Sequence, residues 1–155
     1  MGKHARILVV DDDESIRKTL AIILGEQGYQ VDTAENGKEA IAKSNARFYN
    51  LALIDIRLPD MEGTELLTRM RDATPRMRKI IITGYPTIPN AIEAVNRRAD
   101  GYVLKPFKMD KVLETIKEQL TKQEEEGKYS EEKVANFIGT RARELDTNIT
   151  GRKSQ

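Results

Sequence analysis

Short apolar runs alternate along the chain with longer segments in which apolar residues recur every three or four positions. The short runs are rich in Val, Ile and Leu, which is typical of strands covered on both faces of a sheet. We expect strands at Ile7–Val10, Gln30–Ala34, Leu51–Ile56, Ile80–Thr83 and Tyr102–Leu104. The longer segments have the period of amphipathic helices. We expect helices at Ser15–Gln27, Lys38–Arg47, Thr64–Arg71, Asn90–Arg98 and Met109–Leu120.

Five strand–helix units in alternation predict an α/β fold, with a parallel sheet, helices on both of its faces and right-handed crossovers. Local signals support the boundaries of the first two helices. Asp13 or Ser15 can cap the first helix, Gly28 stands where a helix usually stops, and Asn36-Gly37 predicts a turn before the second helix. Ligands of such sheets bind at the carboxyl ends of the strands, near the switch in strand order. A functional site is therefore expected at that edge of the sheet.

The last part of the chain has a different character. We expect residues 1–120 to form the α/β domain and residues 121–155 to form a C-terminal extension. Residues 121–128 are rich in charge and predict a helix end or a linker. Ser130 can cap a short amphipathic helix, and a polar end follows. One face of that helix would carry Val134, Phe137, Ile138, Ala142 and Leu145. The helix could pack on its own domain, dimerise, or bind another protein, and the sequence leaves these open.

Composition excludes several classes of protein. The chain has 26 Lys and Arg against 25 Asp and Glu, a net charge of +1, which gives no electrostatic reason to expect nucleic acid as a direct partner. It has no cysteine, so disulfides and thiol chemistry are excluded. No apolar run approaches the ~20 residues that cross a membrane, and no targeting segment is visible. These features favour a cytoplasmic protein with no membrane partner.

Polar side chains follow four of the five predicted strands. Asp11 and Asp12 follow the first strand, Asp55 lies near the end of the third, Thr83 ends the fourth, and Lys105 follows the fifth. Parallel strands bring these ends to one edge of the sheet. Three carboxylates suit a hard divalent cation such as Mg²⁺. One of them could attack phosphorus, while the cation and a lysine neutralise the transferring oxygens.

Each of these residues also has an ordinary structural explanation. An acidic pair after a strand is more often a helix cap than a metal site, a strand-ending Thr is usually there for its β propensity, and a Lys before Pro is usually a solvated loop charge. Asp55 differs, because it falls within an apolar strand where an unpaired carboxylate is costly. The residues are weak signals singly and a strong signal together.

With these residues in this order, the sequence resembles the receiver domain of two-component response regulators. The resemblance runs from about Arg6 to Leu120. Its motifs are Leu8-Val9-Val10-Asp11-Asp12, Leu53-Ile54-Asp55 continuing through Leu58-Pro59-Asp60-Met61-Glu62-Gly63, Ile82-Thr83-Gly84, and Tyr102-Val103-Leu104-Lys105-Pro106-Phe107. The resemblance implies a flavodoxin-like, doubly wound five-stranded parallel sheet. It also implies a signalling switch rather than an enzyme, one that catalyses only its own phosphorylation and dephosphorylation.

The resemblance assigns roles to the residues of the acidic cluster. Asp55 matches the phosphoacceptor. Asp11 and Asp12 match the metal-binding acidic pair, with Asp12 the direct ligand. Asp55 and the backbone carbonyl at Arg57 complete the implied Mg²⁺ site.

Four further matches concern the fourth and fifth strands. Thr83 matches the hydroxyl that engages the phosphoryl group, and Lys105 matches the lysine that pairs with it. Tyr102 matches the aromatic residue that changes rotamer on activation. Pro106 matches a proline whose preceding peptide bond is often cis. Gly84 replaces a commoner alanine, and both are small enough to leave room for phosphate.

The implied partners are a sensor histidine kinase or phosphotransfer protein and an unidentified downstream effector, with a homodimer left open. Two alternatives compete. The chain could be the N-terminal receiver fragment of a longer transcription factor. It could also be a haloacid-dehalogenase-type phosphatase using Asp11, since Asp11 and Asp13 have that spacing; Glu14 and Ser15 do not fit that motif, and Asp55 would be unexplained.

Overall fold

The structure is a computed structural model that describes residues 5–70, 76–84, 94 and 99–154, with side chains at all of these except 129, 130 and 140–154. The chain divides into two compact units, Met1–Gln123 and Glu124–Gln155. The predicted helix Asn90–Arg98 lies outside the described residues, apart from Ala94, which is helical and buried.

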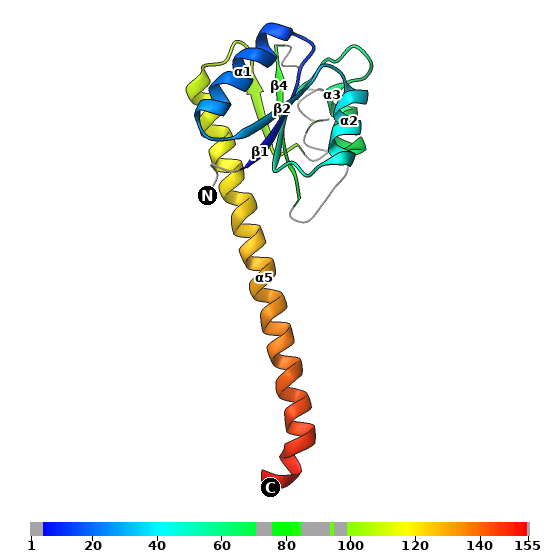
Figure 1. Ribbon diagram of the computed structural model, residues 1–155, viewed down its shortest axis with the longest axis vertical. Coiled ribbons are helices and arrows are strands. Elements are labelled where there is room, and N and C mark those ends of the chain that lie inside the picture. Colours follow the sequence, from blue (N-terminus) through cyan, green and yellow to red (C-terminus); the bar gives the residue numbers. More distant parts are fainter. Residues whose placement is uncertain (1–4, 71–75, 85–93, 95–98, 155) are drawn as a thin grey trace. The chain divides into compact units, whose positions relative to one another are not determined.

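A five-stranded parallel sheet forms the centre of the first unit (Figure 1). Its strands are β1 (Arg6–Val10), β2 (Gln30–Ala34), β3 (Leu51–Asp55), β4 (Arg78–Thr83) and β5 (Gly101–Leu104). They are arranged in the order β2-β1-β3-β4-β5, and every neighbouring pair is parallel. The strand order reverses between β1 and β3, so the edge where these two strands end is the expected ligand site.

The described helices are α1 (Glu14–Glu26), α2 (Gly37–Ala46), α3 (Gly63–Arg69) and α5 (Met109–Ser154). In Figure 1, α1 and the first turns of α5 cover one face of the sheet, and α2 and α3 cover the other. The predicted doubly wound α/β fold with a C-terminal helical extension is therefore confirmed.

The sheet faces two separate apolar cores because side chains alternate along each strand. Leu8 and Val10 of β1 point into the core beneath α2 and α3, while Ile7 and Val9 point into the core beneath α1 and α5. β3 and β4 divide in the same way, and all but one of the residues of β3 are buried. Asp55, at the end of β3, is the half-buried exception.

Local signals explain where the first two helices begin and end. Asp13 caps α1 by accepting a hydrogen bond from Ile16 N at 3.2 Å, as predicted. Gly28, with φ of 94°, ends that helix in a conformation that favours glycine. Asn36 lies in the bend between β2 and α2, as predicted, and it also caps α2 by accepting from Glu39 N at 2.7 Å.

Residues 121–128, expected as a helix end or a linker, are helical, since α5 continues without a break to Ser154. Its Glu, Lys and Gln residues have high helix propensity, which outweighs the single Gly127. Gln123, 4% exposed, belongs to the first unit. Its side-chain amide donates to Asn50 O at 2.9 Å and to Arg76 O at 2.8 Å, and it accepts from the Asn50 side chain at 3.1 Å. These bonds hold α5 against the amino ends of the strands.

Candidate functional site

Three carboxylates gather at the carboxyl edge of the sheet, where β1 and β3 end side by side. Asp11 and Asp12 follow β1 directly, and Asp55 ends β3. One carboxylate oxygen from each of the three lies within 4.8 Å of the other two. Asp11 is buried, Asp12 is exposed and Asp55 is half-buried. The cluster is therefore open to solvent on one side and closed on the other.

Lys105 brings a positive charge into this cluster from the end of β5. Its Nζ lies 3.2 Å from Asp11 Oδ2 and 3.4 Å from Asp55 Oδ2. The Lys105 backbone N–H donates to Thr83 O at 2.6 Å, which ties its position to the end of β4. The Lys105–Pro106 peptide bond is cis, the form that the resemblance favours.

The electrostatics of the cluster raise the pKa of two of its members. Burial raises the pKa of Asp55, and the neighbouring Asp11 adds to the effect; Lys105 and the backbone N–H of Arg57 oppose it without cancelling it. Burial alone would lower the pKa of Lys105, but the carboxylates of Asp11 and Asp55 raise it above its usual value. The cluster thus holds more negative charge than one lysine can neutralise.

The backbone around Asp11 and Asp55 is fixed by local hydrogen bonds. Asp11 Oδ1 accepts from Asp13 N at 2.9 Å, and Asp11 O accepts from the Arg17 guanidinium at 2.8 Å. Asp55 Oδ1 accepts from Arg57 N at 3.3 Å. These contacts leave the second carboxylate oxygen of each aspartate to Lys105 and to the centre of the cluster.

The loop after Asp55 is held by residues to which the sequence assigned no role. Asp60 accepts from the backbone N–H groups of Gly37 and Lys38, both at 2.9 Å, so it joins this loop to the start of α2. These hydrogen bonds lower the pKa of Asp60. A Cβ at Gly63 would lie 2.3 Å from Asp55 O, so only glycine fits there. The available signals were an acidic residue inside a short loop and a glycine where the next helix begins.

Thr83 and Tyr102 lie on neighbouring strands next to the cluster. Thr83 ends β4 and is fully buried. Tyr102 pairs in register with Ile81, two residues before Thr83, and packs against the core beneath α2 and α3. The Tyr102 hydroxyl is buried and has no hydrogen-bond partner among the described residues. Burial raises its pKa.

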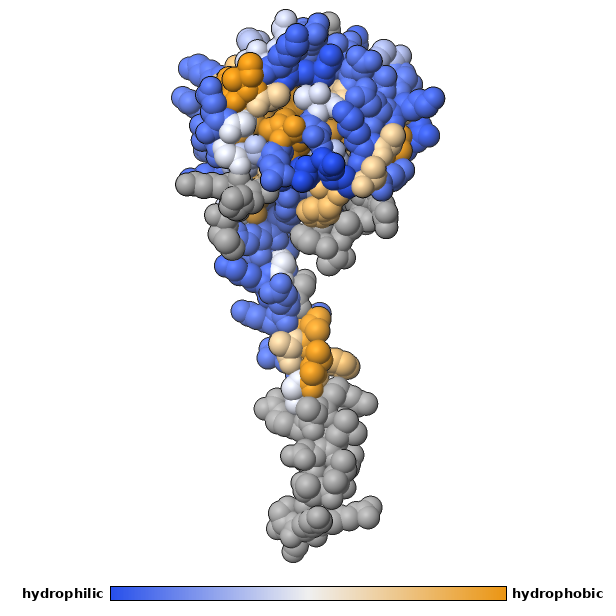
Figure 2. Space-filling view, in the orientation of Figure 1, coloured by the Kyte–Doolittle hydropathy of each residue, from blue (hydrophilic) through white to orange (hydrophobic). Residues whose placement is uncertain are grey.

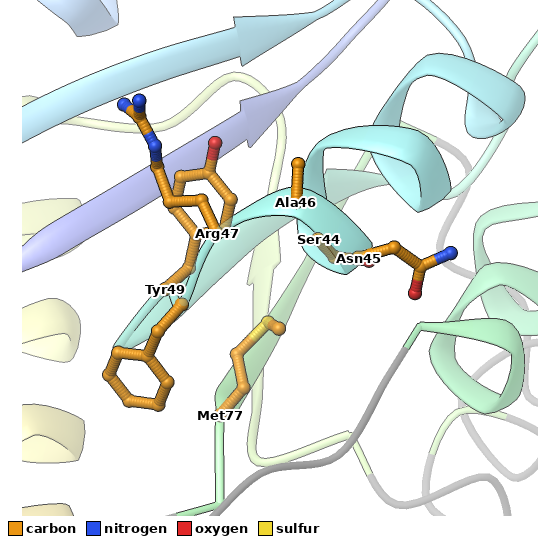
Figure 3. A pocket seen from close by; sticks show the side chains of 7 residues that line it. Ser44, Asn45, Ala46, Arg47, Tyr49 and Met77 are labelled. Carbon is orange, nitrogen blue, oxygen red and sulfur yellow. The ribbon is translucent and has the colours of Figure 1, made fainter.

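A hollow of about 280 Å³ lies at the opposite end of the sheet, before β3 and β4 begin (Figure 3). Met77 and Tyr49 line it, and the Arg47 side chain extends away from Met77 to contact Asp32 at 3.3 Å. The Tyr49 hydroxyl donates to the same Asp32 at 2.6 Å. The described residues of its lining include no carboxylate, so they do not form a second acidic cluster.

Comparison with known proteins agrees with the geometry. The family model of the response regulator receiver domain matches residues 7–117. The chain belongs to this family. Receiver domains are signalling domains rather than a classical enzyme family, and the match leaves no support for the phosphatase alternative.

The curated relatives are longer proteins, and this chain matches only a part of each. The transcriptional regulatory protein ZraR of Klebsiella oxytoca is 37% identical over 119 residues, which cover 77% of this chain and 27% of ZraR. The chain spans between 23% and 31% of the length of the first four curated relatives. No described helix has the combination of length and hydropathy that a membrane crossing requires.

Two solved structures are informative. A CheY-like response regulator receiver domain protein from Methanospirillum hungatei JF-1 is 47% identical with a TM-score of 0.77, covering 80% of this chain and 99% of that one. A response regulator from Burkholderia pseudomallei, solved with a phosphorylated aspartic acid, calcium ion and citrate, is 31% identical with a TM-score of 0.69, covering 79% and 72%.

Proposed function

We propose that the chain accepts a phosphoryl group on Asp55 from a phosphohistidine of a sensor kinase or phosphotransfer protein, in a Mg²⁺-dependent reaction that it catalyses itself. The observation that carries this proposal is the half-buried Asp55 carboxylate, placed among two more carboxylates and Lys105. A carboxylate oxygen of Asp55 attacks phosphorus and forms the acyl phosphate. The bond from phosphorus to the donor nitrogen breaks, and its electron pair stays on the imidazole.

The donor set fits a magnesium ion. Oxygen ligands from Asp12 and Asp55, the backbone carbonyl of Arg57 and the neighbouring Asp11 are the hard donors that Mg²⁺ prefers. When bound, the ion would neutralise charge on the phosphoryl oxygens and on the carboxylates. The phosphorylated aspartate and calcium ion of the Burkholderia response regulator support this assignment by analogy.

The other residues bind and position the phosphoryl group. Lys105 already contacts Asp55, and it pairs with a phosphoryl oxygen once Asp55 is modified. The Thr83 hydroxyl donates a hydrogen bond to a second phosphoryl oxygen. Tyr102 responds to that movement of Thr83 and changes rotamer, which changes the surface offered to an effector. Among the described residues, none forms a hydrogen bond with the Tyr102 hydroxyl that would oppose this change.

The test is phosphorylation by acetyl phosphate, followed by intact mass. The wild-type chain should gain one phosphoryl group only when Mg²⁺ is present, and Asp55→Asn should gain none. Asp13→Asn is the matched control: it removes one charge from the same edge of the sheet, and Asn caps a helix as well as Asp does. Equal uptake by Asp55→Asn and wild type would contradict the assignment, and uptake that depends on Asp11 instead would favour a phosphatase-type site.

The setting of this reaction is also a proposal. We place the chain in the cytoplasm, where response regulators typically act, with a protein effector and no nucleic acid bound directly. Since the chain matches only 27% of ZraR, the alternative that it is the receiver part of a longer transcription factor stays open.

A further inference from the structure

The second unit of the chain exposes an apolar surface that the receiver function does not use. Val134, Phe137 and Ile138 are 57%, 66% and 60% exposed. Figure 2 shows them as an apolar band on α5. Leu145 and Ile149 follow at helical spacing, so Val134, Ile138, Leu145 and Ile149 share one side of the helix. We call these four residues the tail stripe.

The helix that carries the tail stripe has features that disfavour it as an isolated helix. Gly127 and Gly139 lie within it, and glycine weakens a helix interior. Neither glycine has a neighbour within 4 Å of where a Cβ would be, so close packing does not explain them. In water, most helical stability in proteins comes from burying an apolar face. The tail stripe therefore needs a covering surface.

Charge along the second unit indicates what that surface is. Residues 124–132 contain five Glu and one Lys, a net charge of −4, whereas residues 133–153 contain five Lys and Arg against one Glu and one Asp, a net charge of +3. Two copies placed antiparallel set the acidic half of each helix against the basic half of the other. Two copies placed parallel set like halves together.

Three charged residues on the same side of the helix as the tail stripe distinguish the antiparallel from the parallel arrangement. Glu131, Arg141 and Arg152 are each three, four or seven residues from members of the stripe. In a parallel pair each would face its own copy, which repels. An antiparallel pair that aligns Val134 with Ile149 and Ile138 with Leu145 instead brings Glu131 opposite Arg152.

We propose that the tail stripe binds the tail stripe of a second copy of this chain in antiparallel orientation. The contact area of two short helices is below that of a standard stable interface. The dimer is therefore weak and depends on concentration.

The first test is sedimentation velocity of the full chain over a concentration series. Ile138→Gln should weaken the dimer about tenfold or more, because each dimer loses two apolar side chains from its centre. Ile22→Gln is the matched control, since Ile22 on α1 is 62% exposed and lies outside the tail stripe. A monomer at every concentration, or equal effects of the two substitutions, would overturn the proposal, and circular dichroism would show that both variants stay folded.

The second test addresses orientation by charge reversal. Glu131→Arg and Arg152→Glu should each weaken the dimer several-fold, and the double variant should restore it, because the pair is re-formed with its signs exchanged. In a parallel dimer, each reversed residue would still face its own copy and none of the three variants would differ from wild type. That result would refute the antiparallel arrangement.

The third test uses the absence of cysteine from the chain. A Val134→Cys chain mixed with an Ile149→Cys chain should form a disulfide-linked heterodimer on mild oxidation. The Val134→Cys chain alone should link poorly, since its two cysteines would stand at opposite ends of the stripe. Efficient linking of Val134→Cys to itself would overturn the proposal in favour of a parallel pair.

Discussion

Replacing Asp55 with Asn should make the protein more stable in the absence of divalent cations. The Asp55 carboxylate lies within 4.8 Å of the Asp11 carboxylate and 3.4 Å from Lys105 Nζ. At an effective dielectric constant of about 20, the repulsion from Asp11 is at least about 3.5 kcal/mol and the attraction to Lys105 is about 5 kcal/mol. These two nearly offset each other, so the desolvation of the half-buried carboxylate, which costs several kcal/mol, decides the sign.

The raised pKa of Asp55 points the same way, with burial as its largest cause. Asn removes the charge and can still accept the hydrogen bond from Arg57 N. We expect a gain of about 1–2 kcal/mol in unfolding free energy at pH 7. For a domain of this size, that is a rise in Tm of roughly 5 °C or more.

The assay is urea unfolding followed by circular dichroism, with EDTA present, at pH 7 and near pH 4. A carboxyl whose pKa is raised on folding destabilises the folded state above that pKa and ceases to do so as pH falls toward the unfolded value. The gain from Asp55→Asn should therefore shrink at the lower pH. It should also shrink on adding Mg²⁺, because an ion that binds only the folded state stabilises the wild type more.

Asp13→Asn provides the control, since it removes an exposed charge and keeps the helix cap. Its stability should match that of the wild type at both pH values. Equal or lower stability of Asp55→Asn at pH 7 without metal would refute the reasoning, because attraction to Lys105 would then outweigh desolvation.

Three further outcomes are expected. Asp12→Asn should lower Mg²⁺ affinity in a calorimetric titration at least tenfold, because it removes a direct oxygen ligand, whereas Asp13→Asn should change it little. Thr83→Ala should prevent beryllofluoride from shifting the NMR signals of Tyr102, and Thr83→Ser, which keeps the hydroxyl, should retain the shift. Asp100→Ala should cost about 3 kcal/mol in urea unfolding, since Asp100 is half-buried and accepts hydrogen bonds from Arg and backbone donors at 2.6–3.2 Å. Burial alone would raise the pKa of Asp100, but these hydrogen bonds lower it. The wild type should therefore lose this stability only as pH falls below about 4.

The sequence was sufficient for the sheet and for the position of the acidic cluster. Each described strand begins and ends within two residues of its prediction, because buried parallel strands are short apolar runs bounded by polar residues. Asp11, Asp12 and Asp55 meet because parallel strands end at one edge, a rule that needs no side-chain detail. The roles of these residues in binding metal and phosphate stay predictions.

The extension was less predictable from local pattern. A run of Glu, Lys and Gln is compatible with a solvated linker or with a solvated helix, since both keep charge in water. In the structure these residues are helical. The first unit ends at the buried Gln123, whose side chain forms a hydrogen bond with Asn50, 73 residues away in sequence. Such a contact forms only in the assembled fold, so the hydrophobic periodicity around Gln123 does not predict it.

Asp60 shows the same limit at the site itself. Its place in a short loop predicts only a turn residue, yet its carboxylate binds the backbone N–H groups of Gly37 and Lys38. Together with Gly63, which lets the chain pass close to Asp55 O, this contact positions the loop that carries the Arg57 carbonyl. A metal ligand supplied by backbone has no side chain to reveal it. Its position depends on the loop around it, and so the motif after Asp55 encodes the shape of the site more than its chemistry.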